Sequence, residues 1–155
     1  MNILFVCTGN TCRSPMAAAI MQHLCNEDGL DIRIESAGLL AADGEPATKE
    51  AILALAELEI SLEGHKSQPV TEELIKKSDL IITMTEAHKM LLADLAGEKT
   101  RTICELADID GEISDPYGGD LEDYKETANK LYIALSHIED NFYQILSEEE
   151  NNEQR

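Results

Sequence analysis

The sequence predicts an α/β fold with a single domain, in which helices cover both faces of a four-stranded parallel sheet. Four short β-prone stretches alternate with helical stretches along the chain, and this alternation is typical of parallel sheets. The chain has 155 residues, enough for one domain with a sizeable core. The first strand leads directly into a glycine-containing loop and a helix start, which is where such sheets bind anions.

The first half of the chain is expected to contain two strands and two helices. Asn2–Cys7 is a continuous apolar run and Asp31–Ser36 alternates apolar with polar residues, so both are predicted strands. Between them a helix is expected to start with Ser14 as its N-cap and to stop at Gly29. Thr48–Glu57 follows as a second helix.

The second half continues the alternation. In chain order the expected elements are the helix Thr71–Lys77, the strand Asp79–Met84, the helix Thr85–Ala96 and the strand Thr100–Cys104. A loop rich in Asp and Gly, Leu106–Asp120, then precedes a long final helix, Leu121–Leu146. We expect residues 1–146 to form the domain and the acidic residues 147–155 to form a frayed tail.

Composition and charge exclude several classes of function. The formal net charge is −19, and a chain without a basic face neither displaces counterions from nucleic acids nor favours anionic membranes. No apolar run approaches the length of a membrane span. The four scattered cysteines do not suggest a secreted disulfide framework. We therefore expect a cytoplasmic protein; the oligomeric state stays open.

The junction between the first strand and the first helix carries the strongest functional signal. From Cys7 to Pro15 it reads CTGNTCRSP, so five residues separate a cysteine from an arginine. A loop of this length can wrap once around a phosphate with its amides pointing inward, and Arg13 can hold two phosphoryl oxygens with its planar guanidinium. The residues expected to contact phosphate are Thr8, Gly9, Asn10, Thr11, Cys12 and Ser14.

Cys7 lies where this positive field would act on it. Inward amides, the Arg13 guanidinium and a helix N-terminus all stabilise a thiolate, which is the nucleophilic form of cysteine. Ser14 is expected to donate a hydrogen bond to the sulfur and to help it leave later. Each residue taken singly is an ordinary structural feature, but their order at a strand–helix junction predicts a catalytic loop. The glycine-rich nucleotide-binding motifs and a second pair of zinc ligands are missing from the sequence, so no metal and no cofactor are expected.

The run VCTGNTCRSP resembles the loop of the low-molecular-weight protein phosphatase family, and the resemblance extends from Asn2 to about Phe142. The other matches, in order, are Ser36-Ala37-Gly38, His65 and Asp115-Pro116-Tyr117. This resemblance implies a four-stranded parallel sheet flanked by helices. It also implies a metal-independent phosphatase that acts on phosphorylated proteins through a cysteinyl-phosphate intermediate.

Asp115 is the expected general acid, because a phosphatase needs a proton donor for the leaving group. It precedes Pro116 in the loop after the fourth strand and matches the Asp-Pro pair of the family. Tyr117 resembles the aromatic wall at the pocket mouth. By the same resemblance, a hydrogen-bond network that stiffens the loop is expected from Asn10, Ser14, Ser36 and His65. A turn-opening Asp, an exposed Tyr and a solvated His are the alternatives.

The resemblance also implies that Cys12 can trap Cys7 in a reversible disulfide, the alternative being an inert buried thiol. The remaining cysteines and histidines are interpreted as structural: Cys25, Cys104, His23, His88 and His137.

Thr11 is the residue that bears on the substrate. Many tyrosine-specific relatives carry an aliphatic residue there, whereas threonine resembles the protein-arginine phosphatase branch, and a hydroxyl can bind a guanidinium group. Acidic residues expected near the pocket mouth also favour a cation; they are Asp115, Asp120, Glu122 and Asp123. Ala18 stands where the family usually has Glu, with no consequence that the sequence reveals.

Three functions are therefore weighed. A phosphoprotein phosphatase leads, with phosphoarginine ahead of phosphotyrosine as its substrate. Arsenate reduction on the same fold would need a cysteine pair near residues 80–90, but the chain has no Cys between positions 26 and 103. A non-enzymatic phosphate-binding module would not need Cys7, Arg13 and Asp115 together.

Overall fold

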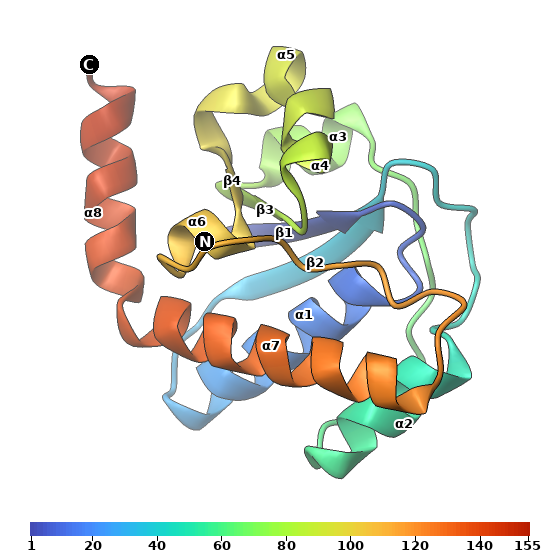
Figure 1. Cartoon of the computed structure of the whole chain (residues 1–155). Helices are drawn as coiled ribbons and strands as arrows, with labels where there is room; N and C mark the ends of the chain where they lie inside the picture. The colour runs from blue at the N-terminus through green and yellow to red at the C-terminus, as the bar shows by residue number, and fades with distance from the viewer.

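The computed structural model describes the backbone of residues 1–155 and every side chain except those of Glu149, Asn152 and Glu153. Its sheet has four parallel strands, as predicted, and their order is β2-β1-β3-β4 (Figure 1). The strands are β1 (Asn2–Cys7), β2 (Arg33–Gly38), β3 (Leu80–Thr83) and β4 (Thr100–Thr102). Strand β2 lies on one side of β1, and the chain then crosses to the other side of β1 to form β3. The strand order therefore reverses at β1, whose C-terminal end carries Cys7.

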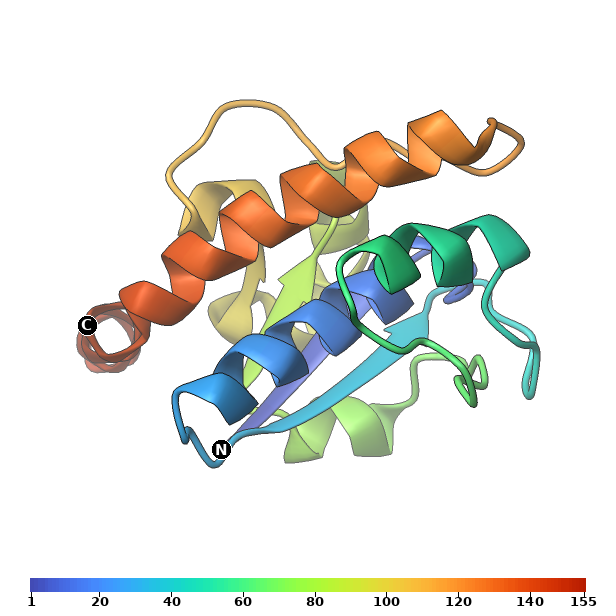
Figure 2. The same cartoon turned by 90° about the horizontal axis from the view of Figure 1, so that it is seen from below.

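Helices cover both faces of this sheet (Figures 1 and 2). They are α1 (Arg13–Glu27), α2 (Lys49–Glu57), α3 (Glu72–Lys77), α4 (Glu86–Leu91), α5 (Ala93–Ala96), α6 (Ile103–Leu106), α7 (Leu121–Asp140) and α8 (Phe142–Glu153), with a 3-10 turn η1 (Gly97–Lys99) before β4. Helices α1, α2 and α7 pack on one face, and α3 and the α4–α5 segment pack on the other. None of the described helices combines the length and apolar character needed to cross a bilayer.

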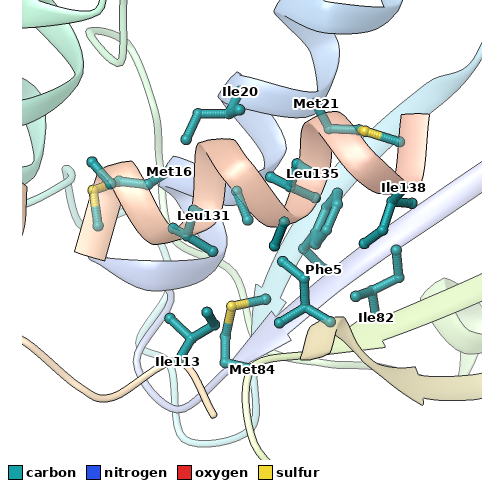
Figure 3. Packing of buried hydrophobic residues seen from close by; sticks show 14 of the residues in the cluster. Phe5, Met16, Ile20, Met21, Ile82, Met84, Ile113, Leu131, Leu135 and Ile138 are labelled. Carbon is teal, nitrogen blue, oxygen red and sulfur yellow. The ribbon is translucent and has the colours of Figure 1, made fainter. Parts of the chain in front are cut away.

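The alternating sides of the strands produce two apolar cores. Phe5 and Ile82 face α1 and α7, whereas Leu4, Val6 and Ile81 face the opposite layer. Figure 3 shows the larger core, where side chains from the sheet meet Leu131, Leu135 and Ile138 of α7 and Met16, Ile20 and Met21 of α1. Burying aliphatic side chains of this size contributes about 1.5–3 kcal/mol each, so the sheet provides a firm base for the loop after β1.

The first helix begins two residues earlier than expected. Its N-cap is Cys12, whose side chain makes no capping bond, and Ser14 lies in the first turn. The Ser14 hydroxyl is 2.9 Å from the Cys7 sulfur, so it is used in the loop rather than as a cap. Pro15 is tolerated because the first turn of a helix has free N–H groups.

Three other element predictions were wrong in detail. The expected helix Thr85–Ala96 is interrupted at Leu92, which divides it into α4 and α5. The fourth strand ends at Thr102, because Thr102 and Glu105 form a capping box that starts α6.

The long final helix also breaks. At Asn141 the chain turns sharply from α7 into α8 (Figure 1), and the Asn141 side chain donates to the carbonyl of His137. Helix α8 runs on to Glu153, so residues expected to fray are helical. The division into residues 1–146 and 147–155 stays a prediction.

Candidate active site

The loop between β1 and α1 folds around Asn10, whose φ of 57° is left-handed. Its buried amide donates to the Ser14 hydroxyl at 2.8 Å and to the Ser36 hydroxyl at 2.9 Å. Its side-chain oxygen accepts from the backbone N–H of Gln68 at 3.0 Å, and the ring of His65 lies 2.7 Å from its carbonyl oxygen. Asn10 tolerates this conformation better than most residues, and its side chain joins three segments distant in sequence.

The structure thus brings together all four residues of the predicted network and adds a fifth. Gln68 also donates from its side chain to the carbonyl of Ser36 at 3.0 Å. No sequence motif marks Gln68, since it follows an irregular segment and reaches Asn10 only through the fold. Gly38 is needed here as well, because a Cβ at that position would lie 2.5 Å from the carbonyl oxygen of Thr8.

Cys7 is buried at the C-terminal end of β1 and has Ser14 as its polar neighbour. The Ser14 oxygen accepts from Asn10, so its proton can be donated either to the Cys7 sulfur at 2.9 Å or to the more distant Ala37 carbonyl at 3.5 Å. A hydroxyl donor and the adjacent start of α1 both favour a negatively charged sulfur. The arrangement is suited to a thiolate nucleophile.

Arg13 links the loop to the segment that carries Asp115. Its side chain is 6% exposed and its Nη2 lies 3.5 Å from the Asp115 carboxylate. Its Nη1 donates to the carbonyl of Ile113 at 3.1 Å, and Nη2 donates to the Thr8 hydroxyl at 3.5 Å. These bonds fix the guanidinium plane before any ligand is bound.

Asp115 and Tyr117 complete the mouth of the site. The Asp115 side chain is 50% exposed and accepts from the Tyr117 backbone N–H at 3.1 Å, while Tyr117 is largely exposed. A cavity of about 200 Å³ is lined by the predicted residues Cys7, Thr8, Gly9, Asn10, Thr11, Cys12, Arg13, Asp115 and Tyr117. It is large enough for a phosphoryl group and open at Asp115 to whatever the group is attached to.

Besides Gln68, two further residues near the site were not predicted. His88, interpreted as structural, is buried and lies 2.9 Å from the Thr8 hydroxyl. The predicted topology could have indicated this, because α4 follows the C-terminal end of β3, and the C-terminal end of β1 with Cys7 lies at the same end of the sheet. The second is Tyr124 on α7, whose hydroxyl is 3.5 Å from the Cys12 sulfur; burial and that contact raise its pKa above the ordinary range.

The four cysteines are all free thiols in this structure. Cys12 borders the cavity together with Cys7, and their disulfide stays a prediction. Burial raises the pKa of Cys25 to about 11 and also raises that of Cys104, which suits thiols that are unreactive. Ala18 lies beside Ser36 and His65 in a second hollow of about 420 Å³ behind the loop.

Comparison with known proteins identifies the family and the fold of this chain. The sequence profile of the low molecular weight phosphotyrosine protein phosphatases matches residues 2–151. The chain belongs to this family. A protein-arginine-phosphatase of Bacillus subtilis is 42% identical over 142 residues, which cover 89% of this chain and 94% of the relative.

Other family members bear different names. The protein-tyrosine-phosphatase Wzb of Escherichia coli is 36% identical over 151 residues, covering 96% of this chain and 97% of Wzb. Among solved structures, a YwlE arginine phosphatase mutant with a phosphorylated active-site serine superposes with a TM-score of 0.88 at 38% identity, covering 92% of this chain and 96% of that one. The family is thus clear, while the names of its members divide between two substrates.

Proposed function

We propose that this member of the family is a phosphoprotein phosphatase that works through a cysteinyl-phosphate intermediate and prefers phosphoarginine. The observation that carries the proposal is the position of the Cys7 sulfur. It lies beneath a cavity of phosphate size, 2.9 Å from the Ser14 hydroxyl, with Arg13 and Asp115 paired across the cavity.

In the first step the Cys7 thiolate attacks phosphorus. The bond from phosphorus to the leaving nitrogen or oxygen breaks, and Asp115 gives its proton to that leaving atom. Loop amides and Arg13 hold the phosphoryl oxygens in the transition state. In the second step Asp115 takes a proton from water, the water oxygen attacks phosphorus, and the S–P bond breaks. Ser14 donates to the departing thiolate, and inorganic phosphate is released.

Thr11 supports phosphoarginine as the substrate. It is half-buried, lines the cavity, and has its hydroxyl 3.8 Å from the Cys12 sulfur, a weak partner that a substrate can replace. The neighbouring hollow, which shares Asp115 and Tyr117 with this cavity, is also lined by Asp123 and Glu126, whose negative charge favours a guanidinium group. Relatives named protein-arginine-phosphatases agree with this preference. Phosphotyrosine is the second candidate, favoured by the exposed ring of Tyr117 and by relatives named tyrosine phosphatases.

The test compares kcat/KM on matched phosphoarginine and phosphotyrosine peptides, with reduced protein and no added metal. We expect the wild type to favour phosphoarginine. Thr11→Ile should reverse that preference by about ten- to a hundredfold, whereas Thr11→Ser, which keeps the hydroxyl, should retain it. A wild-type preference for phosphotyrosine would contradict the substrate assignment and leave the Cys7 mechanism in place.

We also propose that the protein acts in the cytoplasm on phosphorylated proteins. Four free thiols suit a reducing compartment. With a net charge of −19, nucleic acids and anionic membranes are unsuitable partners.

A further inference from the structure

His88 lies immediately behind the phosphate cavity without lining it. It is the third residue of α4, its backbone N–H donates to the Thr85 hydroxyl at 3.2 Å, and 6% of its surface is exposed. Its Nε2 is 2.9 Å from the Thr8 hydroxyl, which does line the cavity next to Cys7. The hydrogen-bonded path from His88 to a bound phosphate therefore runs through Thr8.

The surroundings of the other ring nitrogen, Nδ1, indicate which nitrogen of His88 carries the proton. Among the described side chains, Nδ1 of His88 is the buried polar atom with no hydrogen-bond partner. A proton on Nδ1 would be a buried donor without an acceptor, which is rare and costly. Burial and the nearby Arg13 also lower the pKa of His88, against smaller opposite effects of Asp115 and Glu112. The ring is therefore neutral and carries its proton on Nε2, which donates to Thr8.

Counting hydrogen bonds at Thr8 then gives the direction of its own proton. A hydroxyl oxygen has two acceptor positions and one proton. Nε2 of His88 and Nη2 of Arg13, the latter at 3.5 Å, occupy the two acceptor positions. The Thr8 proton must point elsewhere, and the cavity is the open side of this residue.

We propose that His88 is a positioning residue that sets the Thr8 hydroxyl as a hydrogen-bond donor to the phosphoryl group. This inference rests on the proposed function, because it assumes that phosphate occupies the cavity. Arg13 approaches Thr8 from the other side, so one hydroxyl aligns the guanidinium and the phosphoryl oxygen together. Without the Nε2 proton, the Thr8 hydroxyl would turn to His88 as its acceptor and withdraw its proton from the phosphate.

The test is a double-mutant cycle read by two assays. His88→Phe keeps the volume but removes the donor, and Thr8→Val removes the hydroxyl. Each should lower kcat/KM on the preferred phosphopeptide and raise the inhibition constant of inorganic phosphate by roughly tenfold, the loss expected for one hydrogen bond to a charged group. The double variant should be no worse than Thr8→Val alone, because His88 acts through Thr8.

A second pair of variants covers the case in which His88→Phe fails to fold. Glutamine places an amide N–H near the position of Nε2, whereas asparagine places it near Nδ1. We expect His88→Gln to restore phosphate inhibition and activity to within about threefold of wild type, and His88→Asn to behave like His88→Phe.

Additive losses in the cycle, an unchanged inhibition constant in His88→Phe, or equal losses in the glutamine and asparagine variants would each overturn the inference. Failure of the proposed function looks different, since the wild type itself would then hydrolyse neither peptide. In that event protection of Cys7 from iodoacetamide by inorganic phosphate replaces turnover, and the same ranking of variants is expected.

Discussion

The two loops that form the site are held in opposite ways. The phosphate loop, residues 8–12, is bonded by the side chains of Ser36 in β2, of His65, and of His88 in α4, and by the backbone N–H of Gln68. The acid loop, residues 107–120, is anchored where Ile113 donates to the carbonyl of Met84 and accepts from Arg13. Beyond Ile113 the hydrogen bonds within the described loop are short-range, as from Tyr117 to Asp115 and from Gly119 to Pro116, and the Asp115–Arg13 ion pair at 3.5 Å is the long-range contact.

This difference corresponds to what each loop must do. The phosphate loop meets the same tetrahedral group in every substrate, so a fixed geometry lowers the cost of binding the transition state. The acid loop must reach leaving groups of different shape, and Asp115 is half exposed on a segment with few long-range ties. We therefore expect substitutions in the acid loop to change rate alone, and substitutions in the phosphate loop to change both rate and stability.

The largest effect is expected from Asp115→Asn. Removing the proton donor should slow hydrolysis of poor leaving groups by about a hundred- to ten-thousandfold, while activated aryl phosphates are slowed much less. Asp115 is half exposed, and an asparagine oxygen at this position can still accept from Arg13, so the urea midpoint should stay near that of the wild type. A series of leaving groups measures the first expectation, and equal slowing across the series would remove Asp115 from this role.

The second largest effect is expected from Asn10→Gly, which should lower both the stability of the protein and its catalytic rate. Glycine keeps the left-handed backbone of Asn10 but removes the bonds to Ser14, Ser36 and Gln68. Losing them inside a buried network should cost about 2–4 kcal/mol of unfolding free energy. Urea denaturation measures this loss, with Ser36→Ala, which removes one bond, as the matched control at about 1 kcal/mol. A stable but inactive Asn10→Gly would contradict the link between the two properties.

The smallest effect lies outside both loops, at Glu139 near the end of α7. Burial, followed by the neighbouring Asp28 and Asp140, raises the pKa of Glu139 to about 7. Its protonated form therefore stabilises the fold below about pH 4.5, the ordinary value, and this stability is lost as the pH rises to about 7. Glu139→Gln should flatten this dependence of the unfolding free energy on pH. At pH 8 the variant should be more stable than the wild type by about 2 kcal/mol, measured by urea denaturation. Unchanged activity on the phosphopeptide would show that Glu139 does not affect the active site. An unchanged pH dependence of stability would exclude Glu139 as the cause of that dependence.

The sequence predicts the phosphate loop well because the residues that carry its chemistry are consecutive in the chain. Cys7 and Arg13 are linked by a short loop, and the alternation of strands and helices places that loop at the sheet edge where the strand order reverses. Local chemistry also explains where two predicted helices begin, since the hydroxyls of Thr48 and Thr71 each accept a bond from the first turn. The prediction of Ser14 as a cap was wrong because its hydroxyl faces Cys7.

What the sequence does not predict depends on tertiary contacts. Gln68, His88 and Tyr124 reach the loop from 58, 80 and 112 positions away, and no spacing rule covers such distances. The apolar pattern does not mark the breaks at Leu92 and Asn141 either, because it continues through both residues.

The central claim is that the phosphoryl group passes through the sulfur of Cys7. It is tested most directly by quenching the enzyme in acid during turnover of a phosphopeptide and locating the phosphoryl group by peptide mass spectrometry. We predict a phosphorylated Cys7 that accumulates further in Asp115→Asn with an activated substrate, because the second step lacks its base, and a Cys7→Ser protein without steady-state turnover. Normal turnover by Cys7→Ser, or a phosphoryl group found on another residue of the wild type, would contradict the account.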